Sequence, residues 1–262
     1  MFSSASTLEP WMLVLAAFAG LACGFLNAVA SSGSAVTLPI LMMIGLDPIT
    51  ANATNRLPVL CGAISAAGSF QRKGAIPWRL ALRVSVPVTI GTAFGAGLAE
   101  ILPGRDLGLV ITAAVLVALI LLFTKLKHAI ESVQAGELRF GIREWLWFLL
   151  IGVWLGFIVI DGATYLLLAL VLAVGMPLMG ANAIKSVVLI PTSLMALAVF
   201  AMKGNMHWTL GIVMAAGSVA GSLLGVRLAV SEASRRWIFR VLAVVLLAEV
   251  VHLGVHYFAK TA

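Results

Sequence analysis

Residues 24–57 read GFLNAVASSGSAVTLPILMMIGLDPITANATNRL, and this stretch decides how the chain folds. One apolar run ends near residue 30, a short one covers residues 34–46, and a third starts near residue 52. The first interruption holds three serines and a glycine in place of a long polar loop. Irregular backbone inside a membrane protein is tolerated only where protein or a water-filled cavity satisfies it. The pattern therefore predicts a tight hairpin of shortened helices, which either spans the bilayer or re-enters on its own side.

The composition places the chain in a membrane. Of its 262 residues, 62% are hydrophobic and 10% are charged, and the mean hydropathy is +1.11. Soluble domains carry about 25% charged residues. The apolar runs approach the ~20 residues that cross the hydrocarbon core of a bilayer. The expected fold class is therefore an all-α, polytopic membrane protein. The net charge of +7 does not indicate nucleic-acid binding, because the basic residues lie in short connections between apolar runs.

The sequence matches itself when it is shifted by 130 positions. Gly45 falls on Gly175, Asn52 on Asn182, and the next matches keep the same order. The expected organisation is a first transmembrane repeat over 1–124, a cytoplasmic linker over 125–143 and a second transmembrane repeat over 144–262. Repeats with short, interrupted segments at matching positions indicate a transporter. Each half holds five apolar segments, roughly residues 11–30, 34–46, 52–70, 79–101 and 106–124, then 144–160, 162–176, 183–201, 207–229 and 237–257.

The distribution of basic residues predicts the orientation of the two halves. If each half crosses the membrane an odd number of times, thirteen of the 17 Lys and Arg residues lie on one side and four on the other. The positive-inside rule makes the richer side cytoplasmic. The halves are then inverted relative to each other, and both termini lie outside. An even number of crossings places the last basic cluster, Arg235 to Arg240, on the wrong side.

Small residues recur at helical spacing in both halves. Gly91 and Gly95 lie four residues apart, and so do Gly217, Gly221 and Gly225. In membrane proteins such spacing allows helix backbones to approach closely. We expect these glycines to serve helix packing and not the chemistry of a site.

Polar residues gather at the first break and make it a candidate binding site. They are Asn27, Ser31, Ser32, Gly33 and Ser34. A helix start inside a membrane protein offers unpaired N–H groups and about half a positive charge, which suits an anion. The plainer interpretation is a capped helix start, although three serines and a glycine exceed what one cap requires.

Two cations near matching positions add to this candidate site. Arg56 follows Thr54 and Asn55 in the third segment, and Lys185 follows Asn182 in the counterpart of that segment. Intramembrane cations are costly and tend to face cavities or partners. Together with helix starts, they favour an anionic substrate. The alternative is that each cation snorkels to the lipid headgroups.

The second break falls at Asp161 and Gly162, which complete the candidate substrate-binding residues. Asp161 is the acid expected to lie deepest in the bilayer. It either carries a coupling proton, pairs with Lys185 or Arg56, or caps the following helix. We favour the cap or the ion pair over the proton relay.

No enzyme signature occurs in the sequence. HExxH, the P-loop, GxSxG and CxxC are all absent. The two cysteines, Cys23 and Cys61, lie inside apolar segments. The chain is therefore expected not to be an enzyme and to use no cofactor and no metal. Active transport then requires an ion gradient or a separate partner.

The stretch from Gly24 to Trp78 resembles the sulfite exporter TauE/SafE family of membrane permeases. The resemblance covers almost the whole chain and implies a permease of the bacterial inner membrane for sulfite, sulfonates or other small organosulfur or carboxylate anions. The sequence departs from the family pattern at both breaks, where residues 31–34 are serine-rich and residues 161–164 are glycine-poor. The motifs that carry the resemblance are Thr37-Leu38-Pro39, Gly45-Leu46, Ala53 to Leu57 and Lys73 to Trp78, repeated loosely at 181–186 and 203–208.

These observations together predict a secondary transporter, a permease or exporter, of a small anion. The expected substrate is a sulfur oxyanion or organosulfonate such as sulfite or sulfoacetate, moved by alternating access. The expected partners are the lipid bilayer, the anion, a coupling proton or sodium ion, and a second copy of the chain in a homodimer, with no nucleic acid. The alternatives are a passive channel for a small solute and a structural membrane protein without a transport role.

Overall fold

The computed structural model describes residues 9–29, 31, 33–104, 106–111, 113, 140–160 and 162–228. Throughout these residues the regular elements are helices, and no strand occurs among them. The prediction of an all-α fold is therefore confirmed. The labelled helices are α1 (Pro10–Val29), α2 (Ser34–Met43), α3 (Pro48–Thr54), α4 (Arg56–Arg72), α5 (Trp78–Ile101), α8 (Ile142–Phe157), α9 (Gly162–Leu168), η1 (Ala169–Ala173), α10 (Leu178–Met202) and α11 (Trp208–Leu228).

The first break separates a long helix from a short one. α1 has 20 residues, whereas α2 has 10. Between them, Ser31 adopts a φ of +62°, a left-handed conformation that costs a residue with a side chain about 1–2 kcal/mol. Gly45, with a φ of +106°, follows the end of α2 and turns the chain toward α3. The short second segment expected from the sequence is present, but the expectation that both helices of the hairpin are shortened is wrong, because α1 is long enough to cross a membrane.

The third apolar segment of the first half consists of two helices and not of one. α3 ends at Thr54 and α4 begins at Arg56, with Asn55 between them. Pro58 explains the interruption, because it has no N–H to donate to the carbonyl of Thr54 and its ring collides with that carbonyl. Val188 stands at the matching position of the second half, and α10 runs unbroken through it over 25 residues.

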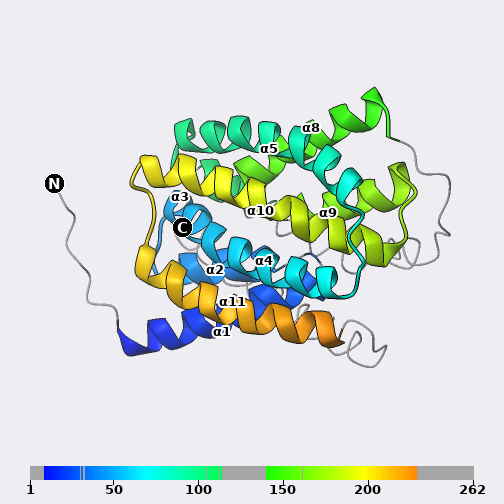
Figure 1. Cartoon of the computed structure of the whole chain (residues 1–262). Helices are drawn as coiled ribbons and strands as arrows, with labels where there is room; N and C mark the ends of the chain where they lie inside the picture. The colour runs from blue at the N-terminus through cyan, green and yellow to red at the C-terminus, as the bar shows by residue number, and fades with distance from the viewer. Residues whose placement is uncertain are drawn as a thin grey trace.

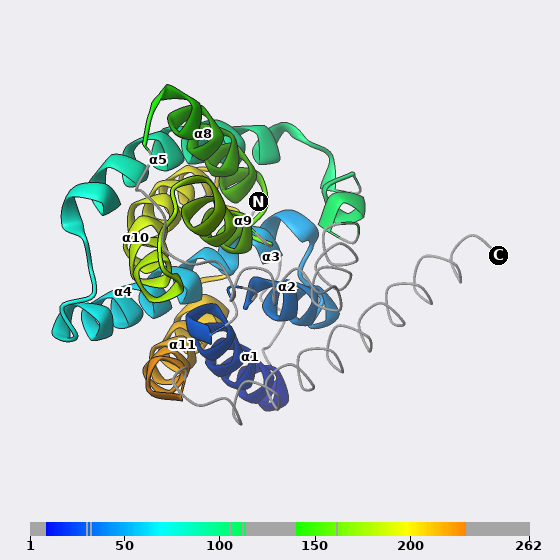
Figure 2. The ribbon, with the colours of Figure 1, turned by 90° about the vertical axis from the view of Figure 1, so that its right-hand side faces the viewer.

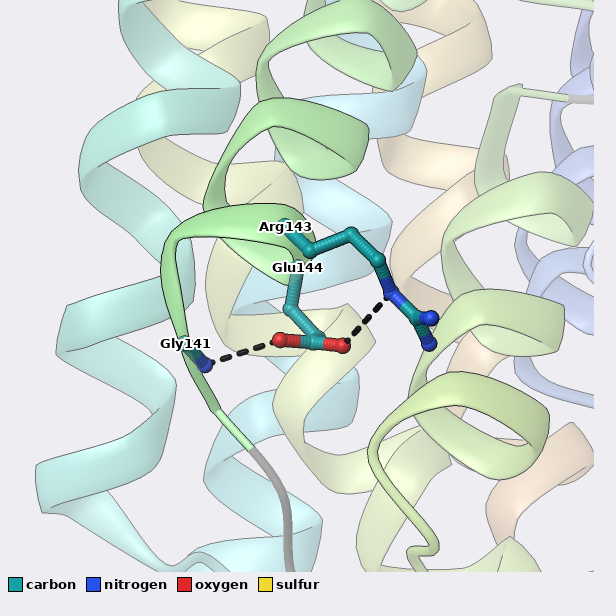
Figure 3. A network of polar contacts seen from close by, with 3 residues as sticks. All are labelled: Gly141, Arg143 and Glu144. Carbon is teal, nitrogen blue, oxygen red and sulfur yellow. Dashed lines mark hydrogen bonds and ion pairs between the residues drawn. The ribbon is translucent and has the colours of Figure 1, made fainter.

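The second half begins with α8, which a carboxylate caps. Figure 3 shows Glu144 reaching back so that its Oε2 accepts a hydrogen bond from the Gly141 N–H at 2.8 Å. The Arg143 Nε donates to Glu144 Oε1 at 3.3 Å. The Arg143 side chain is 76% exposed, so this ion pair adds little stability. The backbone bond fixes the point at which the chain enters α8.

Four of the described helices are long and apolar enough to cross a membrane: α1, α5, α10 and α11. Along α5, the large apolar side chains that remain exposed recur every four residues, at Leu82, Val86, Ile90, Phe94 and Leu98. This spacing places them on one face of the helix, where lipid is the natural solvent. The fifth segment predicted for each half lies outside the described residues, except residues 106–111 and 113, and so does most of the predicted linker.

The two halves interlock through paired helices. α1 lies beside α11 and α8 lies beside α5, in both views of the molecule (Figures 1 and 2). A Cβ added at Gly24 would lie 1.9 Å from Ser218 O, and one added at Gly95 would lie 1.9 Å from Val153 O. The predicted packing role of the glycines is therefore confirmed, because the helix backbones approach so closely that no side chain larger than a hydrogen atom fits between them.

The order of the contacts gives the directions of the helices. Gly20 and Gly24 meet Met214 and Ser218 in the same order, so α1 and α11 run parallel. Short turns over residues 73–77 and 203–207 reverse the chain between α4 and α5 and between α10 and α11. The colour gradient in Figure 1 follows the same division, with α1, α4 and α11 running one way and α5, α8 and α10 the other.

Candidate functional site

The two breaks meet inside the molecule at Ser31. Its backbone carbonyl accepts a hydrogen bond from Thr164 Oγ1 of α9 at 3.2 Å. Its side-chain Oγ accepts from Lys185 Nζ of α10 at 2.7 Å. The strained φ of Ser31 is thus held by contacts from the other half, as is common where strain serves a site. Within the same break, Asn27 Oδ1 accepts from the Gly33 N–H at 3.0 Å.

Lys185 is buried and has three oxygen partners. Lys185 is 1% exposed. Its ammonium donates to Asn27 O at 2.8 Å, to Ser31 Oγ at 2.7 Å and to Asn182 Oδ1 at 2.9 Å. Asn27 lies in the last turn of α1, where the helix end carries about half a negative charge. Lys185 therefore caps the first helix of the opposite half and does not snorkel to the lipid headgroups.

Arg56 does the same for α8. Its guanidinium donates to the carbonyl of Leu155, to Gly156 O at 2.8 Å and to Asn52 Oδ1 at 3.2 Å. The guanidinium also lies 5.5 Å from the centre of the Phe200 ring, in cation–π distance. Leu155 and Gly156 belong to the last turn of α8, so this cation too caps the first helix of the opposite half. The Arg56 Nε has no partner among the described residues.

An asparagine supports each cation. Asn182 Oδ1 accepts from Lys185, which follows it by three residues in α10. Asn52 Oδ1 of α3 accepts from Arg56, which follows it by four residues at the start of α4. Asn52 also donates through Nδ2 to Phe157 O at 2.9 Å, at the end of α8. Asn52 and Asn182 are matched by the shift of 130 positions, so the same asparagine serves the same purpose in both halves.

Asn55 offers a buried donor that nothing in the described part of the chain accepts. Its Oδ1 accepts from Thr37 Oγ1 at 2.6 Å, while its Nδ2 is buried without a partner. The residue is fully buried at the junction of α3 and α4. A buried N–H group left unpaired costs about 1–3 kcal/mol. Together with the Arg56 Nε, it supplies two unused donors on neighbouring residues.

The structure brings most of the predicted site residues together, but not all. Asn27, Ser31, Gly33, Asn182 and Lys185 form one connected cluster. Arg56 and Asn55 lie at the junction of α3 and α4, whereas Thr54 Oγ1 accepts from the His207 N–H at 3.0 Å. Ser34 and Gly162 are buried next to the breaks. Ser32 and Asp161 lie outside the described residues.

Sequence reasoning missed three residues of the site. Asn52, Thr37 and Thr164 each form a hydrogen bond that links segments distant along the chain. The matched pair Asn52 and Asn182 was a signal for the first. The expected arrangement also differs in one respect: the cationic groups of both side chains donate to carbonyls at C-terminal helix ends, because each side chain reaches the first helix of the opposite half.

The fold and the site define a multi-pass helical membrane protein with a buried polar centre. The chain matches the model of the family described as sulfite exporter TauE/SafE over residues 16–253. It is 31% identical over 221 residues to a probable membrane transporter protein of Haemophilus influenzae, covering 81% of this chain and 83% of that one. It is 27% identical over 240 residues to the probable membrane transporter protein YfcA of Escherichia coli, covering 89% and 87%. No solved structure matches it significantly.

The chain belongs to the TauE/SafE family, and the resemblance seen in the sequence is confirmed. It is a membrane transporter of that family and a multi-pass integral membrane protein. A transport role agrees with the absence of enzyme motifs from the sequence.

Proposed function

We propose that this chain is a secondary transporter that moves a small anion through the site between its two breaks by alternating access. The observation that carries the proposal is the buried positive charge at that site. Lys185 and Arg56 contribute two charges, and no acidic side chain of the described residues pairs with either. Each helix end that they cap contributes about half a negative charge. Counted over the described residues, which do not include Asp161, about one positive charge is left over, and a monoanion would balance it.

The unused donors favour an oxyanion. Asn55 Nδ2 and Arg56 Nε are buried donors without a partner among the described residues, and they belong to neighbouring residues at the junction of α3 and α4. An oxyanion offers several acceptor oxygens, and charge-assisted hydrogen bonds to them are the strong ones. The family name points to sulfite. We therefore propose a sulfur oxyanion or organosulfonate such as sulfite or sulfoacetate, with Ser32 and Asp161 retained as proposed site residues.

Alternating access would come from two repeats of opposite orientation. The proposed repeats are residues 1–124 and 144–262, joined by a linker over 125–143. Supporting this, α1 and α8 run in opposite directions, and each packs on the fourth apolar segment of the other half, α1 on α11 and α8 on α5. In transporters with inverted repeats, a pseudo-two-fold axis relates the two halves around a central site. The inward-open and outward-open states can then arise when the halves exchange conformations. The proposal includes an inner-membrane location, both termini outside, a coupling proton or sodium ion, and a homodimer.

A thermal-stability measurement with a matched pair of variants tests the site. Wild-type protein in detergent should gain melting temperature with sulfite or sulfoacetate, because a ligand of the folded state stabilises it. Asn55→Asp keeps the acceptor for Thr37 but replaces the free donor with a negative oxygen, and should abolish the gain. Gln71→Glu makes the same chemical change at an exposed position of α4 and should keep it. An unchanged gain in Asn55→Asp, or no gain in the wild type with any anion, would contradict the proposal.

A further inference from the structure

The three oxygens around the Lys185 ammonium form a closed cage. They come from a backbone carbonyl (Asn27), a hydroxyl (Ser31) and a side-chain amide (Asn182), all between 2.7 and 2.9 Å from Nζ. An ammonium on a side chain has three N–H donors, so each donor has one oxygen. Lys185 therefore has no donor left for a substrate unless one of these bonds breaks.

The cage has the chemistry of a monovalent-cation site. All of its oxygens are neutral, and one belongs to the end of a helix that stops inside the fold. Transporters use such helix ends and unwound carbonyls to hold sodium or protons, and rings of neutral oxygens replace the hydration shell of potassium in channels. The cage shares with such sites its neutral oxygens and its helix-end carbonyl, and its cation is tethered to the protein.

We propose that this cage is a monovalent-cation site that the protein fills with its own ammonium. The left-handed Ser31 supports this, because the strained conformation directs both the Oγ toward Lys185 and the carbonyl toward Thr164. The second half of the molecule provides an independent instance. There the guanidinium of Arg56 occupies the carbonyl end of α8, again as a tethered cation.

One consequence concerns coupling, and it rests on the proposed function. A transporter with a built-in cation at each broken helix end does not need sodium to fill those positions. This favours a proton or a counter-moving anion over sodium as the coupling species. The cage itself requires no transport, so it can be tested without any anion.

The test is chemical rescue of Lys185→Ala. Removing the ammonium leaves the oxygens of Asn27, Ser31 and Asn182 without their lysine donor, and the melting temperature should fall clearly below that of the wild type. n-Propylammonium, which is the missing part of the side chain, should restore about half of the loss or more, and ammonium or potassium less. Tetramethylammonium carries the same charge without an N–H group and should restore nothing. The wild type and Lys203→Ala, which removes an exposed lysine at the end of the same helix, should not respond.

The results separate the cage from the transport proposal. A response of Lys185→Ala no greater than that of the wild type and Lys203→Ala would overturn the cation site, whatever the anion data show. If the variant is recovered only when n-propylammonium is present during purification, the site is supported. If it is recovered under neither condition, Lys185→Gln takes its place, and the site is rejected unless small ammonium ions stabilise that protein and Ser31→Ala in the same background removes the effect.

Discussion

The two cation sites both cap the carbonyl end of a helix, but they differ in how many hydrogen-bond donors remain without a partner among the described residues. Lys185 caps the end of α1 and Arg56 caps the end of α8, and each does so from the opposite half of the chain. Lys185 uses all three of its donors within the protein. Among the described residues, Arg56 Nε and Nδ2 of the adjacent Asn55 have no partner. The Lys185 ammonium therefore contributes charge but has no donor left for a substrate. The arginine site has donors left and is the better candidate to contact the substrate.

The largest expected effect breaks the interlocking that holds the two sites together. Gly24→Val and Gly95→Val each introduce side-chain atoms where the neighbouring backbone lies 1.9 Å from a Cβ. Backbone cannot move aside cheaply, so we expect a loss of more than about 4 kcal/mol and little folded protein. Size-exclusion profiles of the two variants measure this.

Two other glycines serve as controls. A Cβ at Gly68 of α4 or Gly97 of α5 meets nothing within 4 Å. Gly68→Val and Gly97→Val should therefore elute as the wild type does. Equal losses at all four positions would show that the close helix pairs are not what unites the halves.

Exchanging each cation for the other should have the next-largest effect, and it distinguishes the role of Arg56 from that of Lys185. Arg56→Lys removes the Nε donor and shortens the reach to Leu155 and Gly156, because an ammonium has no planar fork. We expect anion affinity to fall about tenfold, or about 1.4 kcal/mol. Lys185→Arg forces a larger group into a filled cage and should lower the melting temperature more than the affinity. Isothermal titration measures the anion affinity of each variant, and thermal unfolding measures its melting temperature. A larger loss of affinity in Lys185→Arg than in Arg56→Lys would mean that Lys185, and not Arg56, contacts the anion.

The smallest effect concerns the bond between the two breaks. Thr164→Val removes the hydrogen bond to Ser31 O without changing the volume of the side chain, and should cost about 1 kcal/mol. Thr192→Val is the matched change, because within the described part of the chain the Thr192 hydroxyl donates to Val188 O of its own helix. It should cost less than about 0.5 kcal/mol. Melting temperatures that fall equally would mean that the breaks are not coupled through this bond.

The sequence was informative about periodicity and about charge. The all-α fold, the short α2 and the packing glycines followed from hydropathy and spacing, and a buried cation is conspicuous in an apolar run. The division of α3 from α4 was missed although Pro58 is visible in the sequence, because apolar character continues on both sides of it.

The partners of the cations were not predictable in the same way. Apart from the bonds to the nearby asparagines, the bonds at the two cation sites join positions a hundred residues or more apart: Arg56 and Gly156, Asn52 and Phe157, Lys185 and Ser31. No local pattern encodes such a contact, since it depends on the way the halves interlock. For that reason the sequence did not predict that the cationic groups would donate to the carbonyl ends of helices.

A counterflow experiment tests the central claim most directly. Proteoliposomes loaded with unlabelled sulfite or sulfoacetate would be diluted into a trace of the labelled anion. A transporter with alternating access should accumulate label transiently above its equilibrium level in the wild type and in Gln71→Glu, and not in Asn55→Asp. Label that only equilibrates would identify a channel, and absence of protein-dependent flux with every anion tested would contradict the account.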